Sequence, residues 1–304
     1  MNLYILKYNM LYYIAKCPTD IKIPTNDFQA IKIYPNHTHL YNKKFIAESQ
    51  NIRCGTHSNI LDQELPNVIV RPMTNLGGMG KGTYYLNDID KISEISKKDF
   101  WCEIFQGEHI SIDIFHNKYG ILGSIGFKGI PGKLFTFNYW EYLPEYQLPP
   151  NIILWINTHL KEFVGVFNLE VIDNKIIECH LRMGDLNYFQ NKELTKLIIQ
   201  CHQNKKIKLP SLPKICLIPI FVDKGKYLKL KEEDIWNCAR KANSIKYITN
   251  YFIDPPPNNN ANPIGGDRIC NLTVTNLEKG LYTRNVILQQ LSNKNWWNNW
   301  WNIF

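Results

Sequence analysis

The sequence predicts an α+β protein in which strands pair mainly as antiparallel hairpins and helices form separate segments. Apolar and polar residues alternate over residues 100–127, as they do in half-buried strands. A glycine-rich loop joins two short strands within residues 67–86. Two further strands form a hairpin whose loop lies at about residues 173–175. Together these features predict two antiparallel sheets with accompanying helices.

The remaining elements follow from hydrophobic periodicity and capping residues. Helices are expected at residues 42–51, 88–98, 150–165, about 231–246 and about 276–291. Strands are expected at residues 67–72, 82–86, 100–105, 108–115 and 119–129, in a hairpin at 167–182, and at 214–223 and 268–274.

Composition limits the class of protein. Hydrophobic residues make up 44% of the 304 residues, which is a globular composition with enough chain for two or three subdomains. The formal net charge of +8 suits a nucleotide or another anionic ligand, and does not by itself indicate a nucleic-acid-binding protein. The eight cysteines form no CxxC pair, which favours reduced thiols over a zinc site or a disulfide framework.

We expect the first residues to form a buried strand or helix and not a targeting signal. Residues 1–17 are apolar but interrupted by Lys7 and Asn9, and they lack a basic n-region and a small-residue cleavage site. No run of 18 apolar residues is present, so we expect no membrane span. We therefore expect a cytoplasmic protein.

The glycine-rich stretch 67–86 reads NVIVRPMTNLGGMGKGTYYL. It is not a P-loop, because Asn75 stands five residues before Gly80, and Gly82 follows Lys81 in place of Ser or Thr. A strand–glycine–strand segment can still bring backbone N–H groups close to a phosphate, since glycine adopts positive φ angles without steric cost. An ordinary β-hairpin fits the same residues, and this stretch alone does not decide between the two.

The stretch CEIFQGEHISIDI places Glu103 and Glu108 on either side of a bend that contains Gly107. Carboxylates at such positions can accept hydrogen bonds from an adenine amino group or from ribose hydroxyls, and Phe105 can provide an apolar wall. The alternative is a surface hairpin with solvated glutamates.

The hairpin 167–182 allows two registers. A two-residue turn at Asp173 and Asn174 would put Glu170 and Glu178 on opposite faces, whereas a three-residue loop through Lys175 would set them directly opposite each other. We expect the second register, because it alone gathers the apolar residues on one face. Those residues are Leu169, Val171, Ile177 and Cys179.

Two carboxylates that face each other across strands repel, so a nearby cation is expected. Oxygen ligands of this kind suit Mg²⁺, which also takes substrate phosphates as ligands. His180 and Arg182 lie on the same face as Glu170 and Glu178 in the expected register. The alternative is a surface cluster that His180 or Arg182 neutralises.

In chain order, these motifs resemble the ATP-grasp superfamily. They are a lysine at the start of a helix, a strand–glycine–strand segment, an E-x-x-x-x-G-x-E linker and a hairpin with two acids, over about residues 42–190. The resemblance is nearest to the ATP-grasp domains of the carbamoyl-phosphate-synthase and biotin-carboxylase type. It implies two α+β subdomains that hold ATP between antiparallel sheets, with a small C-terminal α/β extension.

The resemblance also implies domain boundaries. It gives a reduced accessory segment at 1–40, an ATP-grasp domain at 41–205 and a C-terminal domain of uncertain role at 206–304. The glycine flap subdomain would cover about 67–100, and the metal-site subdomain about 101–205.

Residues that match the family motifs are assigned the family roles. The ATP-binding residues would be Lys43, Arg71, Gly77, Gly78, Gly80, Lys81, Glu103, Phe105 and Glu108. The Mg²⁺ or Mn²⁺ ligands would be Glu170, Glu178 and His180, and His180 stands where the family has asparagine. Arg182, in ECHLR, would be a catalytic residue that binds the transferred phosphate or the acylphosphate.

The implied activity is that of an ATP-dependent ligase. It would activate a small-molecule carboxylate as an acylphosphate for attack by an amine, releasing ADP and phosphate. One alternative is a catalytically impaired relative that acts as a nucleotide-binding or scaffold protein, which His180 favours. The other is a nucleic-acid module, but the tryptophan-rich tail carries no basic residue beyond Lys294 for phosphate contacts. We expect that tail to pack on its own domain or on a second copy in a homodimer.

Overall fold

The computed structural model describes residues 4–5, 17–57, 67–74, 76, 80–87, 94–133, 135–184, 192–222, 245–250 and 266–292. The chain forms two compact units. The larger unit comprises residues 8–130 and 141–213, and the smaller unit comprises residues 1–7, 131–140 and 214–304. Among the described residues, no helix combines the length and the hydrophobicity needed to cross a membrane.

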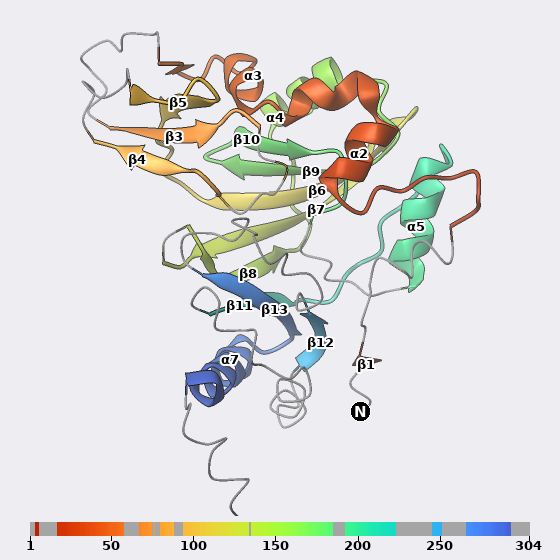
Figure 1. The fold of residues 1–304 in the computed structure, drawn as a ribbon. Helices are drawn as coiled ribbons and strands as arrows, with labels where there is room; N and C mark the ends of the chain where they lie inside the picture. Colours follow the sequence, from red (N-terminus) through yellow and green to blue (C-terminus); the bar gives the residue numbers. More distant parts are fainter. Residues whose placement is uncertain are drawn as a thin grey trace, which may run out of the picture. The chain divides into compact units, whose positions relative to one another are not determined.

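The main sheet of the larger unit is built around β6 (His109–Asn117), which pairs antiparallel with β7 (Gly120–Pro131) and with β9 (Gly165–Ile172) (Figure 1). β10 (Lys175–His180) pairs antiparallel with the other side of β9. The strand order is therefore β7-β6-β9-β10. β8 (Phe137–Leu143), which the sequence did not predict, has residues in both units.

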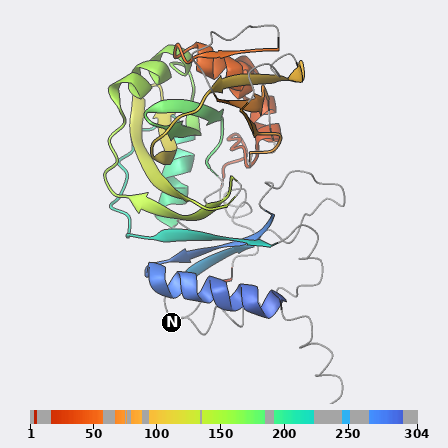
Figure 2. The same cartoon turned by 90° about the vertical axis from the view of Figure 1, so that its left-hand side faces the viewer.

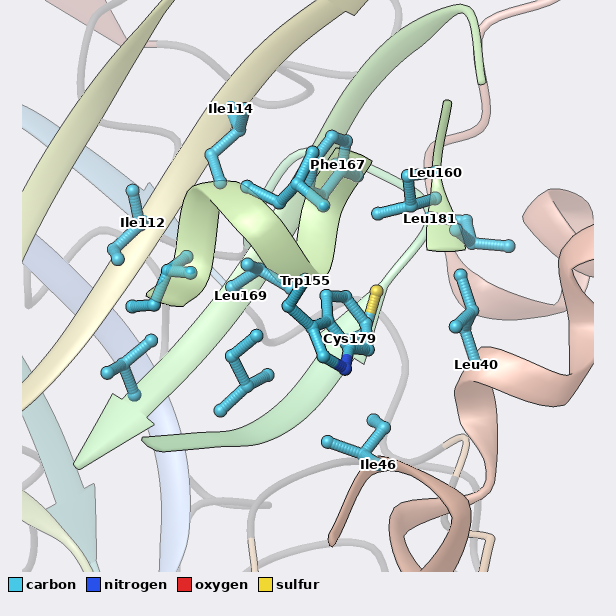
Figure 3. Packing of buried hydrophobic residues seen from close by; sticks show 14 of the residues in the cluster. Leu40, Ile46, Ile112, Ile114, Trp155, Leu160, Phe167, Leu169, Cys179 and Leu181 are labelled. Carbon is cyan, nitrogen blue, oxygen red and sulfur yellow. The ribbon is translucent and has the colours of Figure 1, made fainter. Parts of the chain in front are cut away.

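The apolar face of this sheet packs against α4 (Pro150–His159) (Figure 3). Ile152, Trp155 and Ile156 of α4 are buried, and Trp155 Nε1 donates a hydrogen bond to Ser49 Oγ at 2.8 Å. The helix ends at His159, before the expected end at residue 165, and Ile153 on its outer side is 37% exposed. The strands contribute Ile112, Ile114, Phe167, Leu169 and Cys179 to this core, and Leu181 follows β10 directly.

Three short helical segments precede the second sheet. α2 (Asp27–Ile33) begins at Asn26, whose side chain accepts from Gln29 N, and η1 (Pro35–Tyr41) is a 3₁₀ helix that begins at a proline. α3 (Lys43–Glu48) begins at Asn42, as expected, because the Asn42 side chain accepts from the backbone N–H groups of Lys44 and Phe45. α2, η1 and the later α5 (Lys192–His202) were not predicted from the sequence.

The second sheet of the larger unit has the strand order β2-β5-β3-β4. These strands are β2 (Cys54–Gly55), β3 (Val68–Pro72), β4 (Tyr84–Leu86) and β5 (Asp99–Glu103). β3 and β4 pair antiparallel on either side of the glycine-rich loop, so the strand–glycine–strand prediction is confirmed. The helix expected at 88–98 lies mostly outside the described residues.

The turn between β9 and β10 corrects one expectation. Asp173 and Asn174 both have positive φ angles, of 50° and 59°, and Ile172 pairs with Lys175. This is a two-residue turn, so the three-residue loop expected from the sequence is wrong. Asp and Asn tolerate the left-handed conformation better than most residues, which makes the tight turn accessible.

A β-bulge restores the pairing that the longer loop was meant to explain. The register shifts between Ile176 and Glu178, so that Glu170 lies opposite Glu178 as expected. The extra residue also changes which isoleucine is buried. Ile176 belongs to the core, whereas Ile177, which the expected register placed on the apolar face, is only partly buried.

The smaller unit contains a sheet with the order β1-β12-β13-β11. Its strands are β1 (Tyr4–Ile5), β11 (Cys216–Val222), β12 (Ile245–Asn250) and β13 (Asp267–Val274). α7 (Leu277–Ser292) packs on β11 and β13 (Figure 2). β11, β13 and α7 confirm the predicted strands and final helix. Most of the expected helix at 231–246, and the tail 293–304, lie outside the described residues.

We predict that Phe167→Ala lowers the free energy of unfolding by about 3–5 kcal/mol, because it removes a fully buried ring from the core of the larger unit. Leu154→Ala on α4 is the control, since Leu154 is 68% exposed and its loss should change stability by about 0.5 kcal/mol or less. Urea denaturation followed by circular dichroism measures both. Equal effects of the two substitutions would contradict this description of the core.

Candidate functional site

The polar face of the main sheet carries two rows of side chains across β6, β9 and β10. The strand registers align Ser111, Glu170 and Glu178 in one row. They align Asp113, Asn168 and His180 in the next. The two rows are connected, since the Asn168 amide donates to Ser111 Oγ at 3.0 Å and to Asp113 Oδ1 at 2.9 Å. The two acids of the predicted metal pair therefore lie within a longer polar surface.

Glu178 is the centre of this surface. Lys43 Nζ donates to Glu178 Oε1 at 2.6 Å, and Arg71 Nη2 donates to the same oxygen at 2.5 Å. His180 Nε2 lies 3.4 Å from the other oxygen, Oε2. Burial alone would raise the pKa of Glu178, but the charge of Lys43, the hydrogen bond from His180 and the charge of Arg71 bring it well below its ordinary value. Glu178 is therefore a buried, ionised carboxylate.

Lys43 and Arg71 reach Glu178 from two different segments. Lys43 is the first residue of α3, and its backbone N–H donates to Met73 O at 2.8 Å, just after β3. Arg71, on β3, also donates through Nη1 to the carbonyl oxygen of Ile177 at 3.1 Å. Ile177 is the extra residue of the bulge, so the bulge both aligns Glu178 with Glu170 and supplies an acceptor for Arg71. Both basic side chains are buried.

A second buried carboxylate, Asp27 at the start of α2, was missed from the sequence. It accepts two hydrogen bonds from Arg182, from Nε to Oδ1 at 2.9 Å and from Nη2 to Oδ2 at 3.1 Å. Tyr41 donates its hydroxyl to Asp27 Oδ1 at 3.2 Å and accepts from the backbone N–H of Leu181. Asp27 belongs to no motif and lies over 150 residues from Arg182 in the chain, so no local sequence signal could have found it.

His180 connects the two carboxylates. Its Nδ1 lies 3.3 Å from Asp27 Oδ1, while its Nε2 faces Glu178. Burial would lower the pKa of His180, but the hydrogen bonds with Asp27 and Glu178 raise it to about 9. Burial would raise the pKa of Asp27, but its hydrogen bond and Coulombic attraction to His180 and the charge of Arg182 lower it to about 2. The ring is therefore protonated near neutral pH and donates to both acids, and a metal ion bound at Nε2 would take the place of the proton on that nitrogen.

The predicted adenine and ribose residues lie at the end of β5, where Glu103 is the last residue, and on the loop to β6, which contains Phe105 and Glu108. Lys175 Nζ lies 3.5 Å from Glu103 Oε1 and 4.7 Å from the centre of the Phe105 ring. Glu108 is exposed and forms an ion pair with Lys128. Gly107 lets this loop approach the turn between β9 and β10 closely, because a Cβ atom at position 107 would lie only 3.0 Å from Asp173 Cβ. The loop thus lies beside the turn between β9 and β10, the hairpin that carries Glu170 and Glu178.

The described part of the glycine loop is a tight turn. Gly80 and Gly82 have φ angles of 63° and 73°, and Thr83 N donates to Gly80 O at 3.0 Å. The Lys81 side chain between them is exposed. Gly77 and Gly78 lie outside the described residues, so their predicted role in the flap stays a prediction.

No protein-family model matches the sequence, and no curated protein matches it. Solved structures are similar in fold. N5-carboxyaminoimidazole ribonucleotide synthetase in its ADP complex is 13% identical, with a TM-score of 0.58 over 86% of this chain and 77% of that chain. The corresponding synthase from Aspergillus clavatus, complexed with ATP, is 13% identical, with a TM-score of 0.55 over 87% and 73% of the two chains.

An L-amino acid ligase from Bacillus licheniformis is also similar, at 13% identity and a TM-score of 0.52 over 83% of this chain and 71% of that chain. All three enzymes are ATP-grasp proteins. This chain has the ATP-grasp fold. The fold predicted from the four ordered motifs is confirmed.

Within the ATP-grasp fold, the residues of the predicted metal site fit a divalent cation. Glu170, Glu178 and His180 each offer a ligand atom, and these atoms lie within 4.8 Å of one another. Carboxylate oxygens suit Mg²⁺ and Mn²⁺, and a neutral imidazole nitrogen suits transition metals better than it suits Mg²⁺. His109 Nε2 contacts Glu170 from the flank at 3.1 Å. A cation bound here would compete with Lys43 for Glu178.

The structure therefore brings part of the predicted site together. Six residues from four elements and the segment that follows β10 form one contact network. They are Asp27, Lys43, Arg71, Glu178, His180 and Arg182. Glu170 lies opposite Glu178, at the edge of this network. Glu103, Phe105 and Glu108 form a separate group beside the hairpin turn.

We predict that Asp27→Ala lowers the free energy of unfolding by about 3–5 kcal/mol, because it leaves the buried Arg182 without its bidentate partner. Glu48→Ala is the matched control, since the Glu48–Lys44 ion pair on α3 is exposed and its loss should cost about 0.5 kcal/mol or less. Chemical denaturation measures both variants. An Asp27 variant as stable as the Glu48 variant would show that the buried pair does not support the fold.

Proposed function

We propose that this protein is an ATP-dependent ligase that activates a carboxylate as an acylphosphate for attack by an amine. One observation carries the proposal: within an ATP-grasp fold, Lys43 and Arg71 converge from separate segments on the buried carboxylate of Glu178. The sequence assigned these same residues to phosphate and metal binding. The similar solved structures whose names mention ATP or ADP support a nucleotide as the ligand.

The charge of the network suits a polyphosphate. Four basic groups and four carboxylates lie on or beside the polar face of β6, β9 and β10. The basic groups are Lys43, Arg71, His180 and Arg182, and the acids are Asp27, Asp113, Glu170 and Glu178. Charges in a buried site interact more strongly than they do in water, so the basic groups can stabilise a multiply charged anion when a divalent cation takes over the carboxylates.

The basic residues have defined tasks in the proposed reaction. Lys43 would bind phosphate oxygens as a point charge, and Arg71 would bind them through its planar fork. A divalent cation held by Glu170, Glu178 and His180 would neutralise charge on the transferring phosphoryl group. Preorganised cations of this kind lower the barrier because charge spreads over the phosphoryl oxygens in the transition state.

The reaction requires no nucleophile from the protein. A carboxylate oxygen of the substrate attacks the γ-phosphorus of ATP, and ADP leaves. The amine then attacks the acyl carbon, and phosphate leaves with the oxygen that came from the carboxylate. Cys179, the thiol on the metal-pair hairpin, faces the core, and burial raises its pKa, so it is unsuited to attack.

We predict that Glu108→Gln weakens ADP binding about tenfold, because it removes one charge-assisted hydrogen bond to the ribose. The fold should not change, since Glu108 is exposed and pairs only with Lys128 among the ion pairs of the described residues. Glu162→Gln, at another exposed position, is the control. Isothermal titration calorimetry measures the affinities. Unchanged ADP affinity in Glu108→Gln would remove the ribose assignment.

We predict that ADP release from ATP requires both a carboxylate and an amine, as measured with a coupled ADP assay across panels of carboxylic acids and amines. Lys43→Met should lower the turnover of an active pair by about a hundredfold or more, because it removes a cation that stabilises the transition state. Nucleotide binding without ADP release for any pair would contradict the ligase and favour the nucleotide-binding scaffold.

A further inference from the structure

Contacts at both ring nitrogens fix the orientation of His180. Nδ1 faces Asp27 Oδ1 at 3.3 Å, and Nε2 faces Glu178 Oε2 at 3.4 Å. Nε2 is therefore the nitrogen that faces Glu178, and Glu170, Glu178 and His180 each offer one ligand atom within 4.8 Å of the others. A flip of the ring would break both contacts.

Asp27 is itself held firmly. It is 2% exposed, binds Arg182 through both carboxylate oxygens and accepts from the Tyr41 hydroxyl. The histidine is thus oriented by a carboxylate that has little freedom to move. In metal sites, a carboxylate on the distal ring nitrogen fixes the tautomer, leaves the other nitrogen as the ligand and increases its basicity.

The choice of histidine at position 180 sets the donor set. Asparagine would offer an amide oxygen, which suits Mg²⁺, whereas His180 offers an imidazole nitrogen. Both cations suit carboxylate and phosphate oxygens, but Mn²⁺, as a transition metal, accepts an imidazole nitrogen more readily than Mg²⁺ does. A mixed set of two carboxylates and one oriented imidazole therefore favours Mn²⁺.

We propose that His180, oriented by Asp27, makes this site select Mn²⁺ over Mg²⁺ as the cation that accompanies the nucleotide. His180 is the specificity-determining ligand, and Asp27 is a positioning residue. This inference rests on the proposed function, because it concerns the same nucleotide site.

A direct readout of the ligand is available from electron spin echo envelope modulation of the full chain with Mn²⁺ and ADP. A manganese-bound imidazole gives a ¹⁴N modulation. We expect this signal in the native protein and its loss in His180→Asn. His109→Asn is the matched control, since His109 is the other imidazole that contacts a predicted ligand, through Glu170, and its removal should leave the signal in place. A signal that survives in His180→Asn would overturn the proposal.

The selectivity is measured by calorimetric titration of ADP in Mn²⁺ and in Mg²⁺. The affinity for ADP in Mn²⁺, divided by the affinity in Mg²⁺, should fall about tenfold or more in His180→Asn. It should fall by a smaller factor in Asp27→Asn, because this variant keeps an acceptor oxygen but loses the charge. His180→Gln, which also offers an amide oxygen, replaces His180→Asn if that variant does not fold.

The outcomes separate this inference from the proposed function. If the native protein binds ADP and the ratio is the same in all variants, the nucleotide site stands and the metal selectivity is wrong. If the ratio falls in His180→Asn but keeps its native value in Asp27→Asn, His180 is the selecting ligand and the positioning role of Asp27 is wrong. If the native protein binds no ADP with either cation, both the proposed function and this inference fail.

Discussion

One buried carboxylate, Glu178, organises the rest of the site. Burying an ionised carboxylate costs several kcal/mol unless it is well paired, so Glu178 requires donors at close range. Lys43 from α3, Arg71 from β3 and His180 from the same strand provide them. These contacts join the segments that contain the helix, the glycine hairpin and the main sheet. The bulge at Ile177 makes this geometry compatible with the two-residue turn, because it returns Glu178 to the polar face and gives Arg71 a carbonyl acceptor.

A second carboxylate extends the network to the N-terminal part of the larger unit. Asp27 binds Arg182 and His180, so α2 is tied to the end of β10. Arg182, the residue that the sequence assigned to the transferred phosphate, is paired with Asp27. The same holds for Lys43, whose amine contacts Glu178. In the proposed function the ion pairs that stabilise the protein are also the groups that exchange partners when phosphate and metal bind, which couples ligand binding to the stability of the site.

The sequence predicted the parts of this arrangement that depend on local pattern. Alternation and turn chemistry were sufficient to place Glu170 opposite Glu178, although by a three-residue loop in place of a tight turn and a bulge. A bulge adds one residue and leaves no signal in the composition. The two-residue register therefore gave the correct turn, and the three-residue register gave the correct pairing of Glu170 with Glu178. Asp27 was missed because its partner Arg182 is distant in sequence and nothing in the flanking residues marks the contact. The pairing of β6 with β9, which completes the polar face, is also nonlocal and invisible to periodicity.

A crystal structure of the protein with ADP and Mn²⁺, collected at the manganese absorption edge, tests the central claim most directly. The account predicts an anomalous peak bonded to Glu178 and His180, with the ADP phosphates beside Lys43 and Arg71 and with the Lys43–Glu178 ion pair broken. ADP bound elsewhere, with Lys43 and Arg71 still paired to Glu178, would contradict it, because the basic residues around Glu178 would then serve the fold and not a nucleotide.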